Sequence, residues 1–564
     1  MNISLQKNHR LFFYVLWLLL GLIQSGFTEL QDDEAYYWVY SRFLDWGYFD
    51  HPPMIALLVK MGYAIFPNEL GVRLFPLLLN IFSLVIIETL IDKKSPFLFY
   101  TIALSIAVLQ LSGFAAVPDI PLIFFTALFF LCYKKFVSNY SLLNSFLLGL
   151  VVALLLYSKY HAVLIVFFVL LSNIRLFTKY QTYLAGIIAL ALFAPHLWWQ
   201  YQHNWVSFRY HLFESNVNAY KPSFTAEYII GQLLIPGPIV GFILLPAAFL
   251  YKPKDTSGSY QIEKALKFTM TGIYIFFLLS SFRGKVEGNW TSPVLVPLII
   301  LSHQFLKEKI TPVAIRGQKI LYKSLPVTLA LVLFARIIMI ADILPVKQIL
   351  ERYHSWKGWP QEMRQKTNGL PIVFSNSYQR ASKYWFYSGQ MTLSQNLYRG
   401  RRNNYNFWPV EDSMLGKQVY FMDKYSMSRF FDSLKTPVGW VGYLYDSSFA
   451  SFSKVTISTS KKIIAKEGQE FTMKCSVKMP QQYETFIRNR QSLSDTTRIG
   501  VFTKTGWLKD IFTPLSLKKM VDEKEFELKI NPELERGKYY LRFSIQSGYY
   551  NSTHNSEKIE LIIE

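Results

Sequence analysis

Apolar residues in the first part of the chain fall into long blocks that short polar stretches separate. Blocks of about 15–25 apolar residues are long enough to cross a bilayer as helices, and the shorter ones are typical of helices that line a cavity. The block 11–27 is followed by many others and by no small-x-small cleavage site, which indicates a span rather than a signal peptide. The pattern predicts about eleven spans, near 11–28, 71–91, 97–113, 119–133, 142–158, 161–174, 181–198, 227–250, 266–282, 291–305 and 325–344.

The pattern changes after residue 344. Residues 345–450 mix short apolar runs such as "QVYFMD" with the helix-like "YQRASKYWFYSG", which predicts a small α/β module. From about residue 452 apolar positions alternate with polar ones, and polar turns separate the runs, which predicts a β-sandwich over 451–564. The alternating positions are Phe471, Met473, Cys475 and Val477 in one run, and Tyr539, Leu541, Phe543 and Ile545 in another.

The predicted fold class is therefore a mainly α polytopic membrane protein with two extracytoplasmic modules. Residues 1–344 form the transmembrane domain, 345–450 the α/β module and 451–564 the Ig-like β-sandwich. The sandwich carries no catalytic constellation, so a structural or partner-binding role is favoured for it.

Composition agrees with a membrane protein. The chain of 564 residues is 51% hydrophobic and 17% aromatic, which is too apolar for a soluble protein of this length. The net charge of +21 would suggest nucleic acid in a soluble protein, but much of the Lys and Arg lies between spans and belongs to no nucleic-acid-binding motif. Cys132 lies in an apolar block and Cys475 in the tail, so we expect neither an internal disulfide nor a Cys-based metal site.

The distribution of cations predicts the orientation. If the N-terminus is cytoplasmic, the inner loops hold more Lys and Arg than the outer loops, as the positive-inside rule requires. An odd number of spans then places the tail outside. The inner set is Lys7, Arg10, Lys93, Lys94, Lys134, Lys135, Arg175, Lys179, Lys252, Lys254, Lys264, Lys267, Lys307, Lys309, Arg316, Lys319 and Lys323; the outer set is Arg42, Lys60, Arg73, Lys159, Arg209, Lys221, Arg283 and Lys285.

Four polar clusters lie on the predicted outer face. They are "DDEAYYWVYSRFLDWGYFDHPP" (32–53), "AAVPDIP" (115–121), "YSKYH" (157–161) and "FRGKVEGNW" (282–290), and the aromatic stretch 195–214 lies between the last two. Carboxylates and cations are costly at a membrane boundary unless they face one another or a watery cavity. We therefore expect the clusters to converge.

A cavity with acids on one wall and Lys or Arg on another suits a lipid phosphate as leaving group, together with a base that activates a hydroxyl. Two alternatives stay open at this point. A transporter or flippase would place its charges near the bilayer midplane between repeated halves, and no repeat is visible. A non-catalytic envelope assembly protein would use the tail to recruit partners. For Lys159, snorkelling to the headgroups is a further alternative.

The ordered motifs resemble a known family. "DEAYYWVYSRFLDWGYFDHPPMIALL", "VPDIPLIFF", "LLYSKYHAVLIV", "WWQYQHNWVSFRYHL" and "RGKVEGNWTSPVLVPL" are similar to segments of bacterial GT-C superfamily glycosyltransferases. These are the family 39-like proteins related to protein O-mannosyltransferases and to the lipid A aminoarabinose transferase. The resemblance covers roughly residues 10–410. It implies transfer of a sugar, with inversion, from a polyprenyl-phosphate donor to an envelope acceptor (glycolipid, glycan or protein) on the periplasmic face of the bacterial inner membrane.

The resemblance also implies roles for residues. The family's Asp-Glu pair falls on Asp33 and Glu34, with Asp33 as general base, and its second acidic position falls on Asp50. The family's Lys at the end of a middle span falls on Lys159, a candidate phosphate ligand. The aminoarabinose transferase has Lys where this chain has His51, which puts in doubt a phosphate contact by charge at that position. The remaining candidates for substrate binding are Tyr37, Tyr48, Asp119, Tyr160, His161, Arg283 and Lys285.

A metal ion is not required by this chemistry. A phosphate leaving group next to Lys has less need of one, although Asp33, Glu34 and Asp50 offer oxygen ligands for Mg²⁺ or Mn²⁺. The predicted partners are the polyprenyl-phosphate sugar, the acceptor and the membrane. The sequence identifies neither the sugar nor the acceptor.

Overall fold

The computed structural model describes residues 2–91, 95–214, 220–254, 259–344, 346–424, 432–437, 439–490 and 493–564. The chain divides into two compact units, Met1–His354 and Ser355–Glu564. The short helix α17 (Lys347–Tyr353) thus belongs with the first unit, beyond the predicted domain end at residue 344. The predicted inner cations Lys93 and Lys94 lie outside the described residues.

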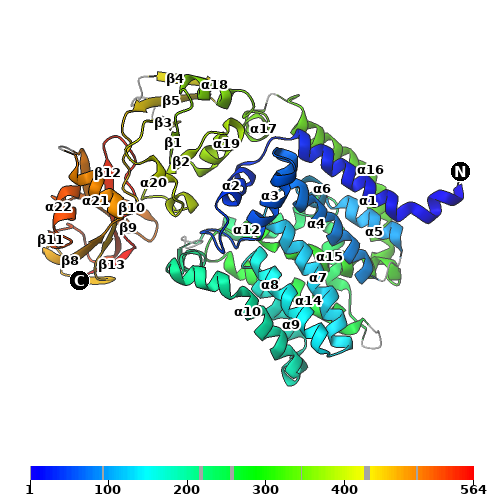
Figure 1. The fold of residues 1–564 in the computed structure, drawn as a ribbon. Coiled ribbons are helices and arrows are strands. Elements are labelled where there is room, and N and C mark those ends of the chain that lie inside the picture. The colour runs from blue at the N-terminus through cyan, green and yellow to red at the C-terminus, as the bar shows by residue number, and fades with distance from the viewer. Residues whose placement is uncertain are drawn as a thin grey trace. The chain divides into compact units, whose positions relative to one another are not determined.

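The first unit is built from helices (Figure 1). The helices of its first half are α1 (Asn2–Phe27), α2 (Asp32–Arg42), α3 (Met54–Ile65), α4 (Glu69–Leu90), α5 (Pro96–Ser105), α6 (Ala107–Leu111), α7 (Asp119–Ser138), α8 (Leu142–Ser158), α9 (Ala162–Ser172) and η1 (Ile174–Thr178). The others are α10 (Tyr180–Gln202), α11 (Val206–Arg209), η2 (Tyr210–Glu214), α12 (Pro222–Leu234), α13 (Gly241–Leu250), α14 (Tyr260–Ser280), η3 (Gly288–Val294), α15 (Leu295–Glu308) and α16 (Pro312–Ile340), followed by α17.

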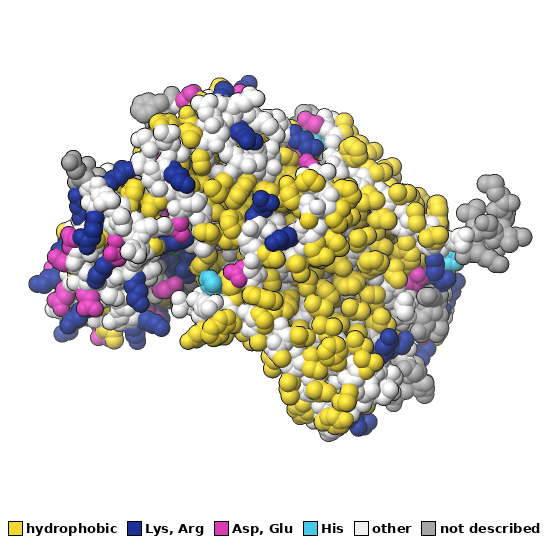
Figure 2. Space-filling model, viewed as in Figure 1, with side chains coloured by type: hydrophobic (Ala, Val, Ile, Leu, Met, Phe, Trp, Pro, Cys, Tyr) yellow, Lys and Arg dark blue, Asp and Glu magenta, His cyan; other side chains and the backbone are white. Residues whose placement is uncertain are grey.

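The helices are those of a multi-pass membrane protein. Within the described ranges, five are long and apolar enough to cross a bilayer, namely α1, α4, α7, α10 and α16, and shorter apolar helices such as α8 and α9 pack among them. Apolar side chains cover much of the surface of this unit (Figure 2). A span needs an apolar surface that faces lipid, which is the reason for this coat. The exact number of eleven spans stays a prediction.

Two predicted spans are broken helices. The block 227–250 is divided into α12 and α13 at "IPGP", where Pro236 has no N–H to donate and Gly237 takes a φ of +143°. The block 97–113 is divided into α5 and α6 at Ile106. The two breaks meet, because Ala107 N donates to Pro236 O at 2.9 Å. Irregular backbone inside a membrane protein needs such a partner.

The helices α2 and α3 follow α1 and fall outside the predicted spans. They carry the acidic stretch and the Pro pair, and α3 packs against α4. The approach of α3 and α4 depends on glycine: a Cβ on Gly62 would lie 2.1 Å from Gly71 O. This packing holds the acidic stretch against the ends of the longer helices.

The second unit, which begins at Ser355, starts with an α/β module. Its five-stranded sheet has the order β2-β1-β3-β5-β4, with β1 parallel to β2 and β3, and β5 antiparallel to its neighbours. The elements are α18 (Trp359–Lys366), β1 (Ile372–Ser375), α19 (Tyr378–Ser388), β2 (Thr392–Gln395), η4 (Asn404–Asn406), α20 (Val410–Met414), β3 (Val419–Asp423), β4 (Asp432–Thr436) and β5 (Gly439–Asp446).

Two further sheets of the second unit enclose one apolar core. Their orders are β10-β9-β12-β13-β7 and β11-β8-β6. The predicted alternation holds in β8 for Met473, Cys475 and Val477, which are buried, while Phe471 is half-buried. In β12 Leu541, Phe543 and Ile545 are buried as predicted, but Tyr539 is half-buried, and Arg542 and Ser544 of the other face are buried as well. The elements are β6 (Thr456–Ser458), β7 (Lys462–Ala465), β8 (Phe471–Lys478), α21 (Gln481–Arg488), β9 (Asp495–Thr503), β10 (Gly506–Phe512), α22 (Leu517–Asp522), β11 (Glu525–Ile530), β12 (Gly537–Ser547) and β13 (Ile559–Ile563).

Candidate active site

Glu34 and Arg73 form a fully buried ion pair that fixes the start of α2. Arg73 donates from Nε and Nη2 to the two carboxylate oxygens of Glu34 at 2.8 and 2.6 Å. Glu34 also accepts from the backbone N–H groups of Gln31 and Ala116, and Arg73 donates to three carbonyls at the end of α1 and the residues after it. Burial by itself raises the pKa of Glu34, but the charge and hydrogen bonds of Arg73 outweigh it and hold that pKa below 4.5.

This ion pair joins two of the four predicted clusters. Glu34 comes from the opening stretch and Ala116 from "AAVPDIP". Arg73 lies near the start of α4, so the ion pair also attaches both clusters to that helix. Both Glu34 oxygens are occupied by protein donors, so the carboxylate acts on the position of its neighbours rather than on a substrate.

The loop after α2 is held by its own aromatic residues. Asp50 is buried and accepts from Tyr36 OH and Tyr40 OH at 3.1 and 3.3 Å. Tyr48 OH donates towards carbonyls of the loop and accepts from the backbone N–H of Asp45. The hydroxyl of Tyr48 is therefore engaged within this segment, and its buried ring stacks on Tyr40 with the ring centroids 4.1 Å apart.

Lys159 and Asp119 form a second buried ion pair, which is the centre of the candidate site. Lys159 Nζ donates to Asp119 Oδ1 at 2.8 Å, and the exposed fractions of the two side chains are 5% and 10%. Ser292 Oγ donates to the same oxygen at 2.7 Å and Asn289 Nδ2 to Asp119 Oδ2 at 3.0 Å. Lys159 thus points into the protein and does not snorkel to the headgroups. The pair joins three of the four clusters.

Two neutral histidines lie beside this pair. Burial lowers the pKa of His51 and of His161 well below 6.5, and the positive charge of Lys159 lowers both further. The Nδ1 atoms of both rings are buried and have no hydrogen-bond partner among the described residues. His161 also packs edge-on against Phe277 at 5.2 Å. At neutral pH these rings present dipoles and apolar faces to a substrate, not positive charge.

The C-terminal end of α10 closes the site from another side. His196 Nδ1 lies 2.8 Å from Trp46 O, which assigns the proton to Nδ1, and Nε2 can then accept from Tyr160 OH at 3.2 Å. Gln200 Nε2 donates to Tyr160 OH and to Ser207 Oγ. A Cβ on Gly47 would lie 2.5 Å from Trp199, so the loop and α10 are in close contact.

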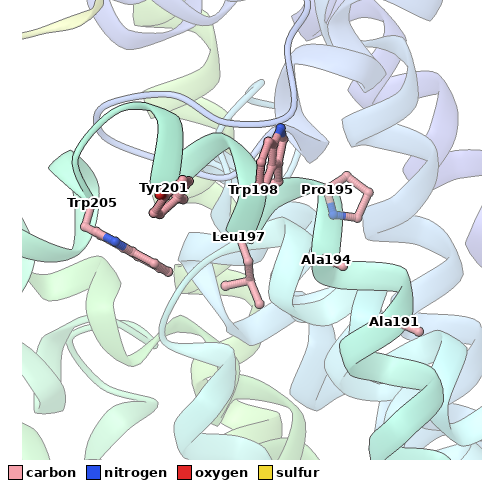
Figure 3. A pocket seen from close by; sticks show the side chains of 7 residues that line it. All are labelled: Ala191, Ala194, Pro195, Leu197, Trp198, Tyr201 and Trp205. Atoms are coloured by element: carbon pink, nitrogen blue, oxygen red, sulfur yellow. The ribbon is translucent and has the colours of Figure 1, made fainter.

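The opposite side of α10 has a different surface. Residues near Pro195 leave a shallow apolar hollow with an aromatic rim (Figure 3). The residues that line it are Ala191, Ala194, Pro195, Leu197, Trp198, Tyr201 and Trp205. The helix therefore separates a polar interior from an apolar surface suited to lipid.

The structure distributes the predicted residues unevenly. Six of the predicted residues lie in or next to the group of polar side chains around the Lys159–Asp119 pair, where they contact one another or are electrostatic neighbours. They are Tyr37, His51, Asp119, Lys159, Tyr160 and His161. Asp33 is exposed in the first turn of α2. Arg283 and Lys285 are exposed, and the contact found for Lys285 is a distant one, 4.0 Å to Glu227 Oε2.

The carboxylates proposed as alternative metal ligands do not form one donor set. Glu34 is neutralised by Arg73, Asp50 accepts from two tyrosines and Asp33 faces solvent. Within the described ranges, no group of three or more His, Cys, Asp or Glu side chains is placed to hold a metal ion. The residues present do not fit Mg²⁺ or Mn²⁺ at this position.

Several residues of the site were not predicted. Asn289 and Ser292, rather than the cations Arg283 and Lys285, bring the fourth cluster to Asp119. Arg73 was predicted only as an outer cation, and His196, Gln200 and His211 only as part of an aromatic stretch. The sequence signal that could have identified Asn289 and Ser292 is the polar stretch "GNWTS" at the start of an apolar block.

Known proteins resemble this chain in sequence and in fold. Residues 50–199 match the family of dolichyl-phosphate-mannose-protein mannosyltransferases. Lipid A galacturonosyltransferase RgtD of Rhizobium johnstonii is 26% identical over 305 residues, which are 51% of this chain and 63% of that protein. The chain thus matches less than two thirds of that relative, and the relative's activity and substrates do not transfer with the match.

The fold matches crystal structures of ArnT from Cupriavidus metallidurans. The apo structure aligns with a TM-score of 0.55 at 11% identity, over 78% of this chain and 98% of ArnT. The structure of ArnT bound to undecaprenyl phosphate aligns equally well, over 77% of this chain. The chain therefore has the fold of ArnT. The resemblance to GT-C membrane glycosyltransferases that the motifs indicate agrees with the family match, the relative and this fold.

Proposed function

We propose that this GT-C protein transfers a sugar from a polyprenyl-phosphate donor to an envelope acceptor on the periplasmic face of the inner membrane, with inversion. The observation that carries the proposal is the buried Lys159–Asp119 pair at the ends of apolar helices, beside neutral histidines and tyrosines. A lipid phosphate at the membrane boundary needs a cation at that depth, and a sugar needs neutral hydrogen-bonding groups beside it.

Lys159 is the proposed ligand of the donor phosphate. As the bond between the anomeric carbon and the phosphate oxygen breaks, its electron pair goes to the phosphate, and a cation stabilises the charge that develops there. Lys159 Nζ donates to Asp119, and in this proposal its ammonium protons are shared between Asp119 and the phosphate. Asn289 and Ser292 hold Asp119 while this occurs.

Asp33 is the proposed general base. It takes the proton of the acceptor hydroxyl as the new bond to the anomeric carbon forms, on the face opposite the leaving phosphate. Its exposure at the start of α2 suits an acceptor that arrives from outside. Glu34 is a positioning residue in this proposal, because its ion pair with Arg73 fixes the turn that carries Asp33. Asp50 is the next candidate for the base.

The sugar and the acceptor are best identified in cells. Mass spectrometry of envelope glycolipids and glycans, from cells with and without the gene, should show one glycosylated species that disappears with the gene. It should also disappear when Asp33→Asn replaces the normal chain. A flippase would leave acceptor glycosylation dependent on another enzyme, and an assembly protein would tolerate Asp33→Asn.

The periplasmic orientation follows from the charge bias and has its own test. A reporter fused after residue 564 should be active outside the cytoplasm and inactive inside it. Cytoplasmic activity at that position would place the tail, and the proposed site, on the wrong side for a donor in the outer leaflet.

A further inference from the structure

Strand β10, the second strand of the β9–β10 hairpin in the second unit, carries exposed apolar side chains along its length. Strand β10 is an edge strand, and its side chains Trp507, Leu508 and Phe512 are 43%, 46% and 66% exposed. Exposed apolar side chains clustered on one short strand are typical of an interaction surface. The three residues are called the hairpin patch below.

A β-bulge produces the patch. The register between β9 and β10 shifts between Trp507 and Lys509, so Leu508 is the extra residue, and the alternation of buried and exposed side chains is lost there. A bulge and flanking lysines on an edge strand also hinder the addition of another β-strand. The backbone edge is therefore a poor site for a second copy of this chain, and the side chains remain as the surface for recognition.

Trp507 is held rigidly in its exposed position. The guanidinium of Arg399 lies 3.5 Å from the centre of the indole ring, and the indole N–H donates to Asp510 Oδ1 at 2.8 Å. Arg399 also donates to Asp510 Oδ2 at 2.8 Å. An aromatic side chain fixed in this way loses little conformational freedom when it enters another medium.

Cations surround the patch. Lys504 lies at the turn and Lys509 in β10, and Arg498 lies 5.0 Å from the ring centre of Phe512. Asp510 is the acid among them, and it is already paired with Arg399 and Arg498. Tryptophan with apolar neighbours and a ring of Lys and Arg is the combination that binds the interface of an anionic bilayer.

We propose that the hairpin patch is a membrane-docking site that inserts into the headgroup layer of anionic lipid. The second unit is covalently joined to the helical unit, which raises the effective concentration of lipid around it, so a weak contact suffices. This inference is independent of the proposed glycosyl transfer, because it concerns neither donor nor acceptor.

The test uses the full chain in nanodiscs, with an environment-sensitive fluorophore attached at Leu508→Cys. The matched control is Ile464→Cys on β7, the opposite edge of the same sheet, which is 56% exposed and flanked by lysines but has no aromatic neighbour. The same labelling of the chain without an added cysteine gives the background of Cys132 and Cys475.

With phosphatidylglycerol in the bilayer, the label at position 508 should shift to the blue and be quenched by lipids that carry a spin label near the headgroup. The label at position 464 should not respond. Lys504→Gln with Lys509→Gln should weaken the docking equilibrium by about 30-fold, or about 5-fold for each cation removed. Equal responses at 508 and 464, or a blue shift at 508 that persists in detergent without lipid, would overturn the proposal.

Discussion

Lys159 Nζ lies 2.8 Å from Asp119 Oδ1, and each side chain is at least nine-tenths buried. The pair links the end of α8 to the start of α7, and Ser292 and Asn289 extend it to η3. A candidate phosphate ligand is thus held in place by a carboxylate before any donor arrives. The consequences of this arrangement can be measured separately for stability and for donor use.

Lys159→Met should lower stability and donor use together. It leaves Asp119 buried without its cation, which costs about 3–5 kcal/mol, and it removes a charge-assisted contact to phosphate worth roughly 1.5–3 kcal/mol. The double variant Lys159→Met with Asp119→Asn should recover the melting temperature but not the donor dependence. The donor concentration at half-maximal rate should stay raised by about 10- to 100-fold. A double variant with normal donor dependence would remove Lys159 from the phosphate site.

Asp33→Asn should reduce turnover by about 10² or more, the scale of a lost general base, with little change in melting temperature. The neighbouring Asp32→Asn is the matched control, because Asp32 is also exposed in the first turn of α2 and has the same charge. Turnover of Asp32→Asn should stay near normal. Equal loss in both variants would indicate a general electrostatic effect at the start of α2, and near-normal turnover of Asp33→Asn would transfer the role to Asp50.

Glu34 should make stability depend on pH in the acid range. Its pKa in the folded protein is held below 4.5, so the unfolded chain binds the proton more readily and stability falls as pH decreases below about 4.5. The melting temperature of the normal chain should fall over that range, and that of Glu34→Gln should be lower at neutral pH and less dependent on pH. Parallel curves for the two proteins would contradict the role of the Glu34–Arg73 pair.

His51 should not act as a cation at neutral pH. Its pKa is well below 6.5 in the folded protein, so the ring stays neutral as pH changes between 6 and 8, and His51→Gln should leave the pH dependence of donor use unchanged there. The sequence had left a phosphate contact by charge at His51 in doubt. A fall in donor affinity between pH 6 and 8 that His51→Gln abolishes would show that the bound phosphate raises this pKa.

The sequence predicted elements whose signal is local. The period-2 runs around Met473 and Leu541 predicted β8 and β12 correctly because their apolar positions are buried in the same core. The block 227–250 was predicted as one span although Pro236 and Gly237 marked its break, because average hydropathy outweighed the local signal. The 12 residues of α3 are too few for a span and were left unassigned.

The partners of the site residues were beyond the sequence. Asp119 and Lys159 are 40 positions apart, and Glu34 and Arg73 are 39 apart, so only the packing of helices brings them together. The general expectation that costly charges converge at a membrane boundary was sound. Which carboxylate pairs with which cation depends on helix rotation, and that is why Arg283 and Lys285 were chosen over Asn289 and Ser292.

The most direct test of the proposed transfer uses the purified chain in liposomes with a synthetic polyprenyl-phosphate sugar and an envelope glycolipid acceptor. Mass spectrometry should find acceptor that is heavier by one sugar, together with an equal amount of released polyprenyl phosphate, and Asp33→Asn should form neither. Movement of intact donor across the bilayer, with no new glycosidic bond for any donor and acceptor tested, would contradict the account.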